Sequence, residues 1–303
     1  MTSLSAASSD PARVTRGVIY MLLSIAIFSV MDAIAKYLSA SYPTVMIMWV
    51  RHMAQSLFVI MLVIRLRQYG VARSARPGFQ LGRAACNIVS TFMFVFSLAF
   101  VPLADAIAIS MAGPLMLTAL SVPLLGEKVG IRRWSAVVVG CIGALIIVRP
   151  GLGVVHWAAM LFMAAAFLNA VFQIGSRKVS AYDSVTTTLF YTTVTGLVLT
   201  SIAVPFFWTP MPRHVWALLI FQGLLAGAAH LAQNKAFAEA PASVLAPLTY
   251  SALLFATTFG FVIFGDFPDT WTIVGALIVV ASGLYVIYRE RVRKRKREAD
   301  TKA

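Results

Sequence analysis

The sequence predicts an all-α membrane protein with ten transmembrane helices. Its 303 residues are 60% hydrophobic and only 12% charged, with a mean hydropathy of +0.84. In soluble domains about a quarter of the residues are charged. Roughly ten runs of about 17 to 24 mostly apolar residues lie between Gly17 and Tyr288, and a helix needs this length to cross a hydrocarbon core of about 30 Å. The sequence has no alternating polar and apolar pattern of the kind that β-barrel strands show. Because backbone groups in lipid must be satisfied internally, the apolar runs are expected to be helices.

Short polar or charged segments separate the apolar runs and set their expected boundaries. A polar segment at 1–16 precedes the first run, and because many further runs follow, it is not expected to be a cleaved signal peptide. The expected spans of the first half are 17–38, 44–64, 81–101, 104–125 and 133–149. Those of the second half are 154–176, 184–204, 214–236, 242–264 and 270–288, and a basic segment at 289–303 follows them.

The distribution of basic residues predicts which side of the membrane each loop faces. If the N-terminus lies in the cytoplasm, most of the 25 Lys and Arg residues fall on the cytoplasmic side, and only Arg149 and Arg213 fall clearly outside. Cytoplasmic loops of membrane proteins carry an excess of Lys and Arg. An odd miscount of spans would destroy this asymmetry. We therefore expect a multi-pass protein of the bacterial inner (plasma) membrane with both termini in the cytoplasm.

The basic segment at 289–303 is expected to contact lipid. It holds eight basic residues against three acidic ones, directly after the last expected span. In a soluble protein the net charge of +14 would favour nucleic-acid binding. A basic cluster beside a membrane helix is instead typical of a cytoplasmic stop signal that touches anionic headgroups. The expected partners are therefore the bilayer and a small molecule, with no nucleic acid, and the sequence leaves the oligomeric state open.

The two halves of the chain contain similar motifs in the same order. The segment 36–40 (Lys-Tyr-Leu-Ser-Ala) ends the first expected span, and 177–181 (Arg-Lys-Val-Ser-Ala) ends the sixth. A Gly-Glu pair at 126–127 follows the fourth span, as a Gly-Asp pair at 265–266 follows the ninth. Because each half has five spans, an odd number, the two copies must cross the membrane in opposite directions. The sequence therefore predicts two inverted five-helix repeats, over 17–149 and 153–288.

Features of the first repeat match a known family. They are Lys36, Arg51, Pro114 and the Leu-Gly-Glu turn at 125–127. With these, the chain resembles the drug/metabolite transporter (DMT) superfamily, and more narrowly its ten-helix members built from two EamA-type repeats. The resemblance covers about 17–288 and implies a central cavity that opens alternately to each side of the membrane.

The second repeat departs from the family pattern. Thr192 stands where an arginine would match Arg51, and Asp266 replaces the glutamate. The segments 246–250 (Ala-Pro-Leu-Thr-Tyr) and 264–268 (Phe-Gly-Asp-Phe-Pro) look like a proteobacterial branch. That branch includes proteins assigned to riboflavin uptake and others assigned to S-adenosylmethionine uptake.

Asp32 and Arg51 are the main candidates for a binding or proton-coupling site. A charge at the middle of a bilayer costs about 2.5–3.5 kcal/mol on insertion scales, so such residues usually face a partner or a wet cavity. At 1.5 Å per residue, both lie about 10 Å below the outer ends of their spans, so they are expected to share a depth. Lys36 also lies four residues after Asp32, on the same helix face. Two interpretations stay open: a neutralised cluster that braces the first two spans, or side chains that bind substrate groups or protons.

Further polar residues inside the spans extend the list of candidates for substrate binding. Asn169 and Gln173 share a face of the sixth span, and the paired motifs make Gln173 the symmetry mate of Asp32. The other candidates are Asn87, His230, Asn234 and the aromatic Tyr250. Each of them also suits ordinary interhelical packing or hydrogen bonding.

A second group of residues is expected to shape or gate the helices. Pro114 and Pro247 lie inside expected spans, where a proline frees a backbone carbonyl and bends the helix. Lys36 and Glu127 lie at the ends of spans and are candidates for gating.

The sequence argues against an enzyme. Pairs at 182–183 and 265–266 are similar to the paired aspartates of intramembrane aspartyl proteases, but Ile263 stands where that pattern has a glycine. The predicted topology also places Asp183 and Asp266 on opposite sides of the membrane. The four histidines show no metal-ligand spacing, Cys86 and Cys141 lie in apolar runs, and no phosphate-binding loop is present. No catalytic residue, metal or cofactor is therefore expected.

These observations together predict a secondary transporter that moves a small organic metabolite by alternating access. Few charges and many aromatic residues in the spans favour a neutral or weakly charged aromatic solute. The resemblance to the proteobacterial branch implies uptake of riboflavin or a similar aromatic metabolite. Export of amino acids or amphipathic drugs stays open as an alternative. An intramembrane enzyme is the more distant one.

Overall fold

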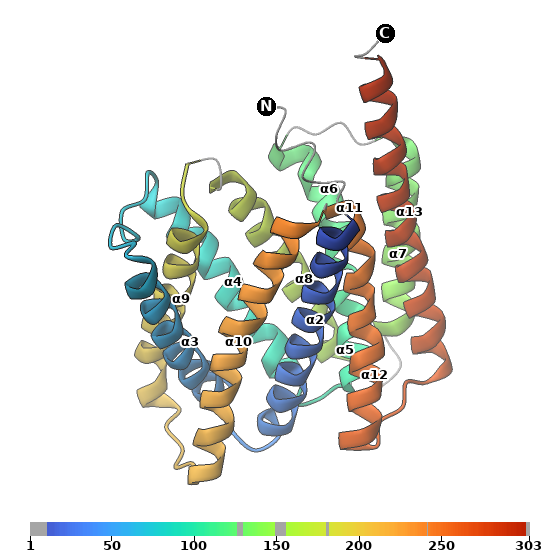
Figure 1. Ribbon diagram of the computed structural model, residues 1–303. Coiled ribbons are helices and arrows are strands. Elements are labelled where there is room, and N and C mark those ends of the chain that lie inside the picture. Colours follow the sequence, from blue (N-terminus) through green and yellow to red (C-terminus); the bar gives the residue numbers. More distant parts are fainter. Residues whose placement is uncertain (1–10, 126–129, 149–155, 180–181, 241, 301–303) are drawn as a thin grey trace.

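The computed structural model describes residues 11–125, 130–148, 156–179, 182–240 and 242–300, and in these ranges the regular secondary structure is helical (Figure 1). Nine helical segments of the described residues are long and apolar enough to cross a membrane, and two of them, Leu103–Leu124 and Pro247–Phe264, are discontinuous. A shorter apolar helix covers Trp134–Val148. The protein is a multi-pass all-α membrane protein, and ten spans fit the structure.

The helices follow the expected spans closely. The first repeat contains α2 (Pro11–Ser39), α3 (Thr44–Leu66), α4 (Pro77–Ser97), α5 (Leu103–Ser110), α6 (Gly113–Leu125) and α7 (Ile131–Val148). The second contains α8 (His156–Val179), α9 (Val185–Ala203), the 3₁₀ turn η1 (Val204–Phe206), α10 (Arg213–Glu239), α11 (Ala242–Leu245), the 3₁₀ turn η2 (Ala246–Tyr250), α12 (Ser251–Phe264) and α13 (Thr270–Asp300).

Local signals explain several helix ends. Pro77 starts α4, where the missing N–H of a proline costs nothing. The Ser184 side chain caps α9 by accepting a hydrogen bond from the Thr187 amide at 3.1 Å. Gly265 ends α12 with φ of +73°, a left-handed conformation that glycine adopts without strain.

The fourth and ninth spans are interrupted at corresponding places. The fourth is divided into α5 and α6 just before Pro114, and the ninth into α11, η2 and α12 around Pro247. A proline inside a helix removes one backbone hydrogen bond and its ring clashes with the preceding turn. The sequence suggested bent spans here, and the structure shows two discontinuous ones.

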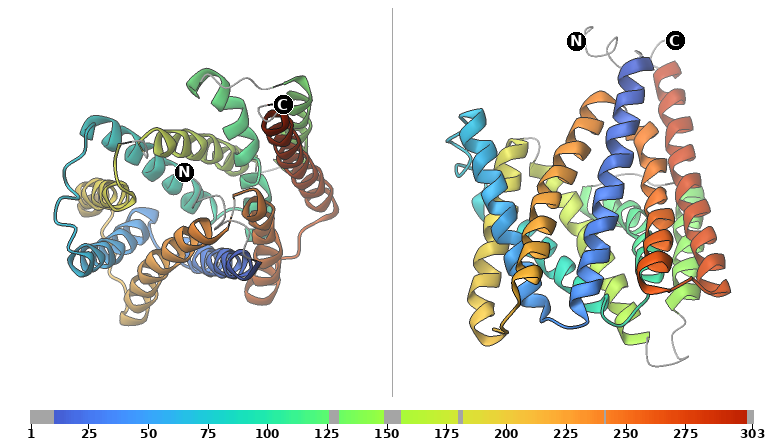
Figure 2. Two further views of the ribbon diagram at one scale, coloured as in Figure 1. Left: turned by 45° about the horizontal axis from the view of Figure 1, so that its top comes forward. Right: turned by 60° about the horizontal axis from the view of Figure 1, so that its bottom comes forward.

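The two repeats run in opposite directions. The N-terminal end of α2 and the C-terminal end of α13 lie at the same end of the bundle, which we call the termini end (Figure 1). α2 begins at this end, whereas α8, its counterpart, begins at the opposite end, here called the far end. Equivalent helices pack in equivalent pairs: α2 against α10 and α4 against α8, with α3 against α9 and α7 against α13 across the pseudo-symmetry axis (Figure 2). Cross-packing between the repeats therefore builds the molecule.

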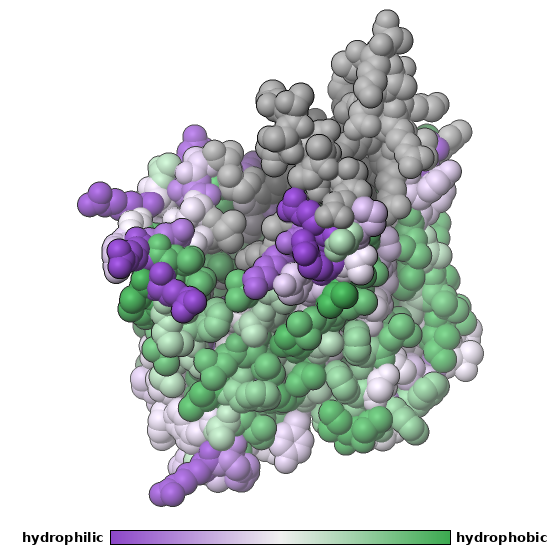
Figure 3. Space-filling view, in the orientation of Figure 1, coloured by the Kyte–Doolittle hydropathy of each residue, from purple (hydrophilic) through white to green (hydrophobic). Residues whose placement is uncertain are grey.

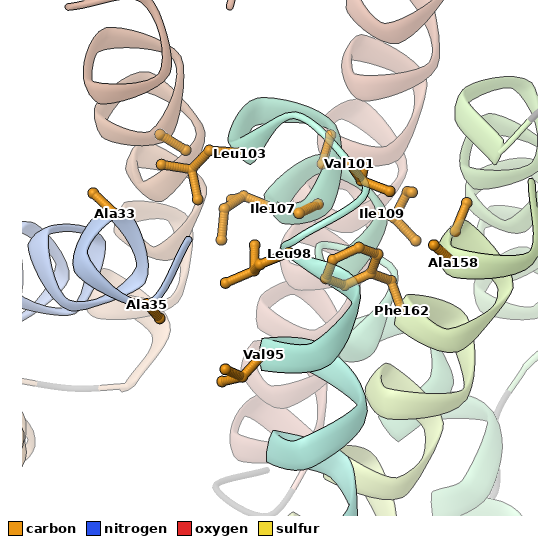
Figure 4. Packing of buried hydrophobic residues seen from close by; sticks show 14 of the residues in the cluster. Ala33, Ala35, Val95, Leu98, Val101, Leu103, Ile107, Ile109, Ala158 and Phe162 are labelled. Carbon is orange, nitrogen blue, oxygen red and sulfur yellow. The ribbon is translucent and has the colours of Figure 1, made fainter. Parts of the chain in front are cut away.

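The far end is filled by a tightly packed apolar cluster. Leu98, Leu103 and Phe162 are fully buried there (Figure 4). Leu38 and residues of α3, α10 and α12 belong to the same cluster. Because α2 and α4 end at the far end and α8 begins there, this cluster closes the bundle on that side.

The outer surface suits a lipid environment. Figure 3 shows apolar side chains over the middle of the molecule and hydrophilic ones towards its ends. Leu254 and Val262 are 70% and 73% exposed, which is expected of side chains that face lipid. α13 continues to Asp300, so most of the basic segment expected as a tail is a helical extension of the last span.

Candidate functional site

A cavity of about 650 Å³ lies between the two repeats. Residues of α2, α3, α4, α5 and α6 line it from the first repeat, and residues of α8, α9 and α10 from the second. Its walls come from the C-terminal parts of α8 and α10 and the N-terminal part of α9, which places it in the middle and the termini half of the bundle. The apolar cluster lies between it and the far end. The volume is in the usual range for small-molecule sites, about 300–1,000 Å³.

Seven of the residues singled out from the sequence line this cavity. They are Asp32, Arg51, Asn87, Pro114, Asn169, Gln173 and His230. They come from six different helices and from both repeats. The fold thus brings together polar groups that lie up to two hundred residues apart in the chain.

Arg51 and Asp32 face the cavity without forming an ion pair. The two charges interact electrostatically. However, none of the ion pairs within 4.0 Å in the described residues joins Arg51 to Asp32. The Nε atom of Arg51 is buried and has no hydrogen-bond partner. The direct contact that would brace the first two spans is therefore absent in this conformation.

Lys36 has partners other than Asp32. Its Nζ lies 3.2 Å from a carboxylate oxygen of Asp266 and donates a hydrogen bond to the Val101 carbonyl at 2.9 Å. It also lies 5.2 Å from the centre of the Phe264 ring. The Lys36 side chain therefore reaches across to the second repeat at the far end and not along its own helix to Asp32.

The remaining candidates lie away from the cavity or outside the described parts. Tyr250 is only 8% exposed and packs against Gly283 of α13, and neither it nor Pro247 lines the cavity. Asn234 belongs to α10, but its side chain lies outside the described residues, as does Glu127.

Neutral polar groups complete the central part of the cavity wall. Gln173 donates a hydrogen bond from Nε2 to Oδ1 of Asn169 at 2.6 Å, so the predicted pair on α8 does form. The His230 ring meets Phe28 edge-on, with ring centres 5.1 Å apart. His52, which the sequence did not single out, also lines the cavity, and its Nδ1 lies 2.7 Å from the Met48 carbonyl oxygen. A proton on Nδ1 satisfies this contact and leaves Nε2 as an acceptor in the neutral ring.

Arg83 is the most connected residue of the site, and sequence reasoning counted it only as a charge near a loop. It is 5% exposed and lines the cavity from α4. Its guanidinium donates to Gln80 Oε1 at 2.9 and 3.2 Å, to Ser176 Oγ at 2.9 Å and to Thr192 Oγ1 at 2.9 Å. It also donates to the Thr188 carbonyl at 3.1 Å. Arg83 therefore joins α4 of the first repeat to α8 and α9 of the second.

Asp183 extends this network beyond the span ends. Its carboxylate accepts hydrogen bonds from Ser74 Oγ at 2.5 Å, from Gln80 Nε2 at 2.7 Å and from the Ala75 amide at 3.2 Å. Desolvation acts to raise the pKa of this carboxyl, but these hydrogen bonds and the charge of Arg83 outweigh it and lower the pKa. We call Arg83, Gln80, Asp183 and their partners Ser74, Ser176, Thr188 and Thr192 the polar latch. The sequence signal that could have indicated this network is the spacing of its members, because Gln80 and Arg83 share one helix face and Thr188 and Thr192 share another.

Comparisons with known proteins agree with this architecture. The model of the EamA-like transporter family matches residues 15–149 and again 156–289. A riboflavin transporter of Vibrio cholerae is 30% identical over 291 residues, covering 93% of this chain and 96% of its own. An S-adenosylmethionine uptake transporter of Rickettsia prowazekii is 27% identical, covering 91% and 93%. A pseudopaline exporter of Pseudomonas aeruginosa is 28% identical, covering 88% and 94%.

A solved crystal structure shares the fold. It superposes with a TM-score of 0.65 at 14% sequence identity, over 91% of this chain and 98% of the other.

Proposed function

Because the chain belongs to the EamA-like transporter family of the DMT superfamily, we propose that it moves a small organic metabolite across the bacterial inner membrane by alternating access. The observation that carries this proposal is the cavity between the inverted repeats, which polar side chains of both repeats line. Inverted-repeat transporters bind their substrates at such an interface, near the middle of the bilayer. Rocking of one repeat against the other would then expose the same site to each side in turn.

Both termini are placed in the cytoplasm by this proposal. The positive charges of the loops support that orientation, which makes the described conformation one whose cavity lies towards the cytoplasm. The basic C-terminal extension of α13 would meet anionic headgroups of the inner leaflet. Reporter fusions at each terminus test the orientation, and a periplasmic C-terminus would contradict it.

Riboflavin or a similar aromatic metabolite is the first candidate substrate, taken up into the cell. The similarity to a riboflavin transporter supports this choice, as do Phe28, Phe94 and Phe172 on the cavity wall, whose rings suit stacking against a flat solute. Expression of the chain in a bacterial strain that cannot make riboflavin is expected to restore growth on low external vitamin. A failure to do so, with the protein confirmed in the membrane, would remove riboflavin from consideration.

Export of an amino acid or an amphipathic compound is the second candidate. The observation in its favour is the similarity to a pseudopaline exporter at nearly the same identity as the uptake proteins. Transport assays in membrane vesicles of both orientations, with a panel of labelled metabolites, separate import from export. An intramembrane enzyme has less support, because Asp183 lies near the termini end and Asp266 near the far end.

A further inference from the structure

The two arginines that line the cavity differ in how far the protein satisfies them. The guanidinium of Arg83 donates five hydrogen bonds to described residues and lies against the Phe172 ring, 4.9 Å from its centre. Arg51 donates no hydrogen bond in the described parts of the chain, and its Nε is buried without a partner. A guanidinium carries five N–H donors, and buried donors without acceptors are costly. Arg51 therefore holds donors that no described residue satisfies.

Asp32 is the acidic residue on the same cavity wall. Its carboxylate forms no ion pair within 4.0 Å with a described basic side chain, although it interacts electrostatically with Arg51. The other titratable residues that line the cavity are His52, His230 and Arg83, and Arg83 belongs to the polar latch. Arg51 and Asp32 thus present an unpaired donor group and an unpaired acceptor group to the cavity from α3 and α2, and no ion pair within 4.0 Å joins them.

We propose that Asp32 and Arg51 form a split binding site for a substrate that presents a hydrogen-bond acceptor beside a donor. Arg51 binds the acceptor, a carbonyl or carboxylate oxygen, and Asp32 binds the donor, an N–H or ammonium group. The proposal rests on the proposed transport function and narrows its substrate class. Charge-assisted hydrogen bonds of this kind are about twice as strong as neutral ones, and here they form away from bulk water.

Two kinds of molecule share this chemistry. The imide edge of a flavin ring has an N–H between two carbonyl groups, and a zwitterionic amino acid has an ammonium beside a carboxylate. Phe28 and Phe94 also line the cavity and offer rings to an aromatic portion of either. The donor of the flavin is a neutral N–H and that of the amino acid is a charged ammonium. Replacing Asp32 with a neutral acceptor therefore distinguishes the two kinds of ligand.

The test measures binding to purified protein in lipid nanodiscs. The flavin arm uses riboflavin and N3-methylriboflavin, and the amino-acid arm uses phenylalanine, its amide and its N-acetyl derivative. With the wild-type protein, blocking either group is expected to weaken binding about tenfold or more. These ligand-side changes need no mutation and so stay informative if a variant does not fold.

Variants then connect each group to its residue. R51Q is expected to weaken binding of the unmodified ligand at least tenfold, whereas R65Q, on the exposed end of the same helix, leaves it unchanged. D32A is expected to weaken riboflavin but to leave N3-methylriboflavin as it was, because the blocked ligand has no N–H to lose. D32N keeps an acceptor oxygen and so retains a flavin far better than an ammonium ligand.

The outcomes separate this inference from the proposed function. If riboflavin binds and rescues growth but R51Q and D32A bind it as the wild type does, the split site is overturned while transport stands. If riboflavin fails but an amino acid binds with the expected dependence on Arg51 and Asp32, riboflavin is retired and the split site stands. If no compound that presents both groups binds to folded wild-type protein, the split site is overturned.

Discussion

The two ends of the bundle are built by equivalent helices but closed by opposite chemistry. Lys36 and Arg177 mark the same point of the two repeats, and the residue before each is Ala35 at the far end and Ser176 at the termini end. Six positions after each marker stand Tyr42 and Asp183. Eleven positions after each stand Ile47 and Thr188.

In every one of these pairs the far-end residue belongs to or packs against the apolar cluster. The termini-end residue belongs to the polar latch. The two inverted repeats therefore form an apolar seal at the far end and a hydrogen-bonded seal at the termini end.

This difference has an energetic consequence for opening. Separating an apolar seal exposes hydrocarbon to water at about 25 cal/mol per Å². Separating hydrogen-bonded groups exchanges them for hydrogen bonds with water, at a net cost of only about 0.5–1.5 kcal/mol each. The contrast therefore predicts that the termini end opens at a lower free-energy cost than the far end. The following changes test it, from the largest expected effect to the smallest.

Truncation of the far-end seal is expected to have the largest effect. Phe162 is fully buried and meets Phe94 edge-on, with ring centres 5.3 Å apart. Phe162→Ala leaves a cavity in the apolar cluster and is expected to lower the free energy of unfolding by about 3–5 kcal/mol. Thermal unfolding in detergent measures this. Phe206→Ala, at a side chain that is 82% exposed, serves as the control and is expected to change little.

Loss of Arg83 is expected to be almost as damaging. Arg83→Ala leaves Gln80 Oε1 and the Thr188 carbonyl without this donor, and Asp183 without its nearby charge. We expect a loss of about 2–4 kcal/mol in stability together with loss of transport. Arg83→Lys keeps the charge but cannot reproduce the planar fork, so it should recover only part of both.

The exposed Arg73 offers a matched control for this test. Arg73→Gln is expected to keep wild-type stability and transport. If Arg83→Ala unfolds at the same temperature as Arg73→Gln, the latch does not hold the termini end together.

The ion pair at the far end is expected to contribute less. Asp266 is more than a third exposed, and Lys36 keeps its hydrogen bond to Val101 without it. Asp266→Asn is expected to cost about 0.5–1 kcal/mol, and less at high salt. A cost above that of Arg83→Ala would show that charge, and not apolar packing, closes the far end.

Acid should weaken the termini end selectively. The pKa of Asp183 is lower in the folded protein than its usual value near 3.8, so its ionised form stabilises the fold above that pH. This contribution is constant at neutral pH and is lost as the pH falls through the lowered folded pKa. Below about pH 4, the unfolding temperature of the wild type should therefore fall by more than the unfolding temperature of Asp183→Asn. Parallel acid profiles for the two proteins would contradict the role given to Asp183.

Much of the fold could be predicted from the sequence because membrane spans are local features. Length, hydropathy and loop charge predict the spans, and the paired motifs predict the two repeats that the family match confirms. The same reasoning found Asp32, Arg51 and Gln173, because polar residues inside apolar runs stand out.

The long-range partners could not be predicted in this way. Arg83 lies near a span end, where a basic residue looks like an ordinary loop charge, and its partners on α8 and α9 are set by helix packing alone. Lys36 has an acidic neighbour one turn away, yet its actual partner, Asp266, is brought near by the crossing of α2 and α12. Sequence spacing describes contacts within a helix, and both of these contacts lie between repeats.

The close contact of α7 with α13 has a practical consequence. A Cβ on Gly275 would lie 2.6 Å from the Gly143 carbonyl oxygen, so the two backbones touch, and neither helix contributes to the cavity wall in the described residues. A fluorescent protein or a rigid crystallisation chaperone fused to the helical extension of α13 would thus be anchored on the packed pair of α7 and α13. There it can report the membrane orientation of the C-terminus without disturbing substrate binding in the cavity.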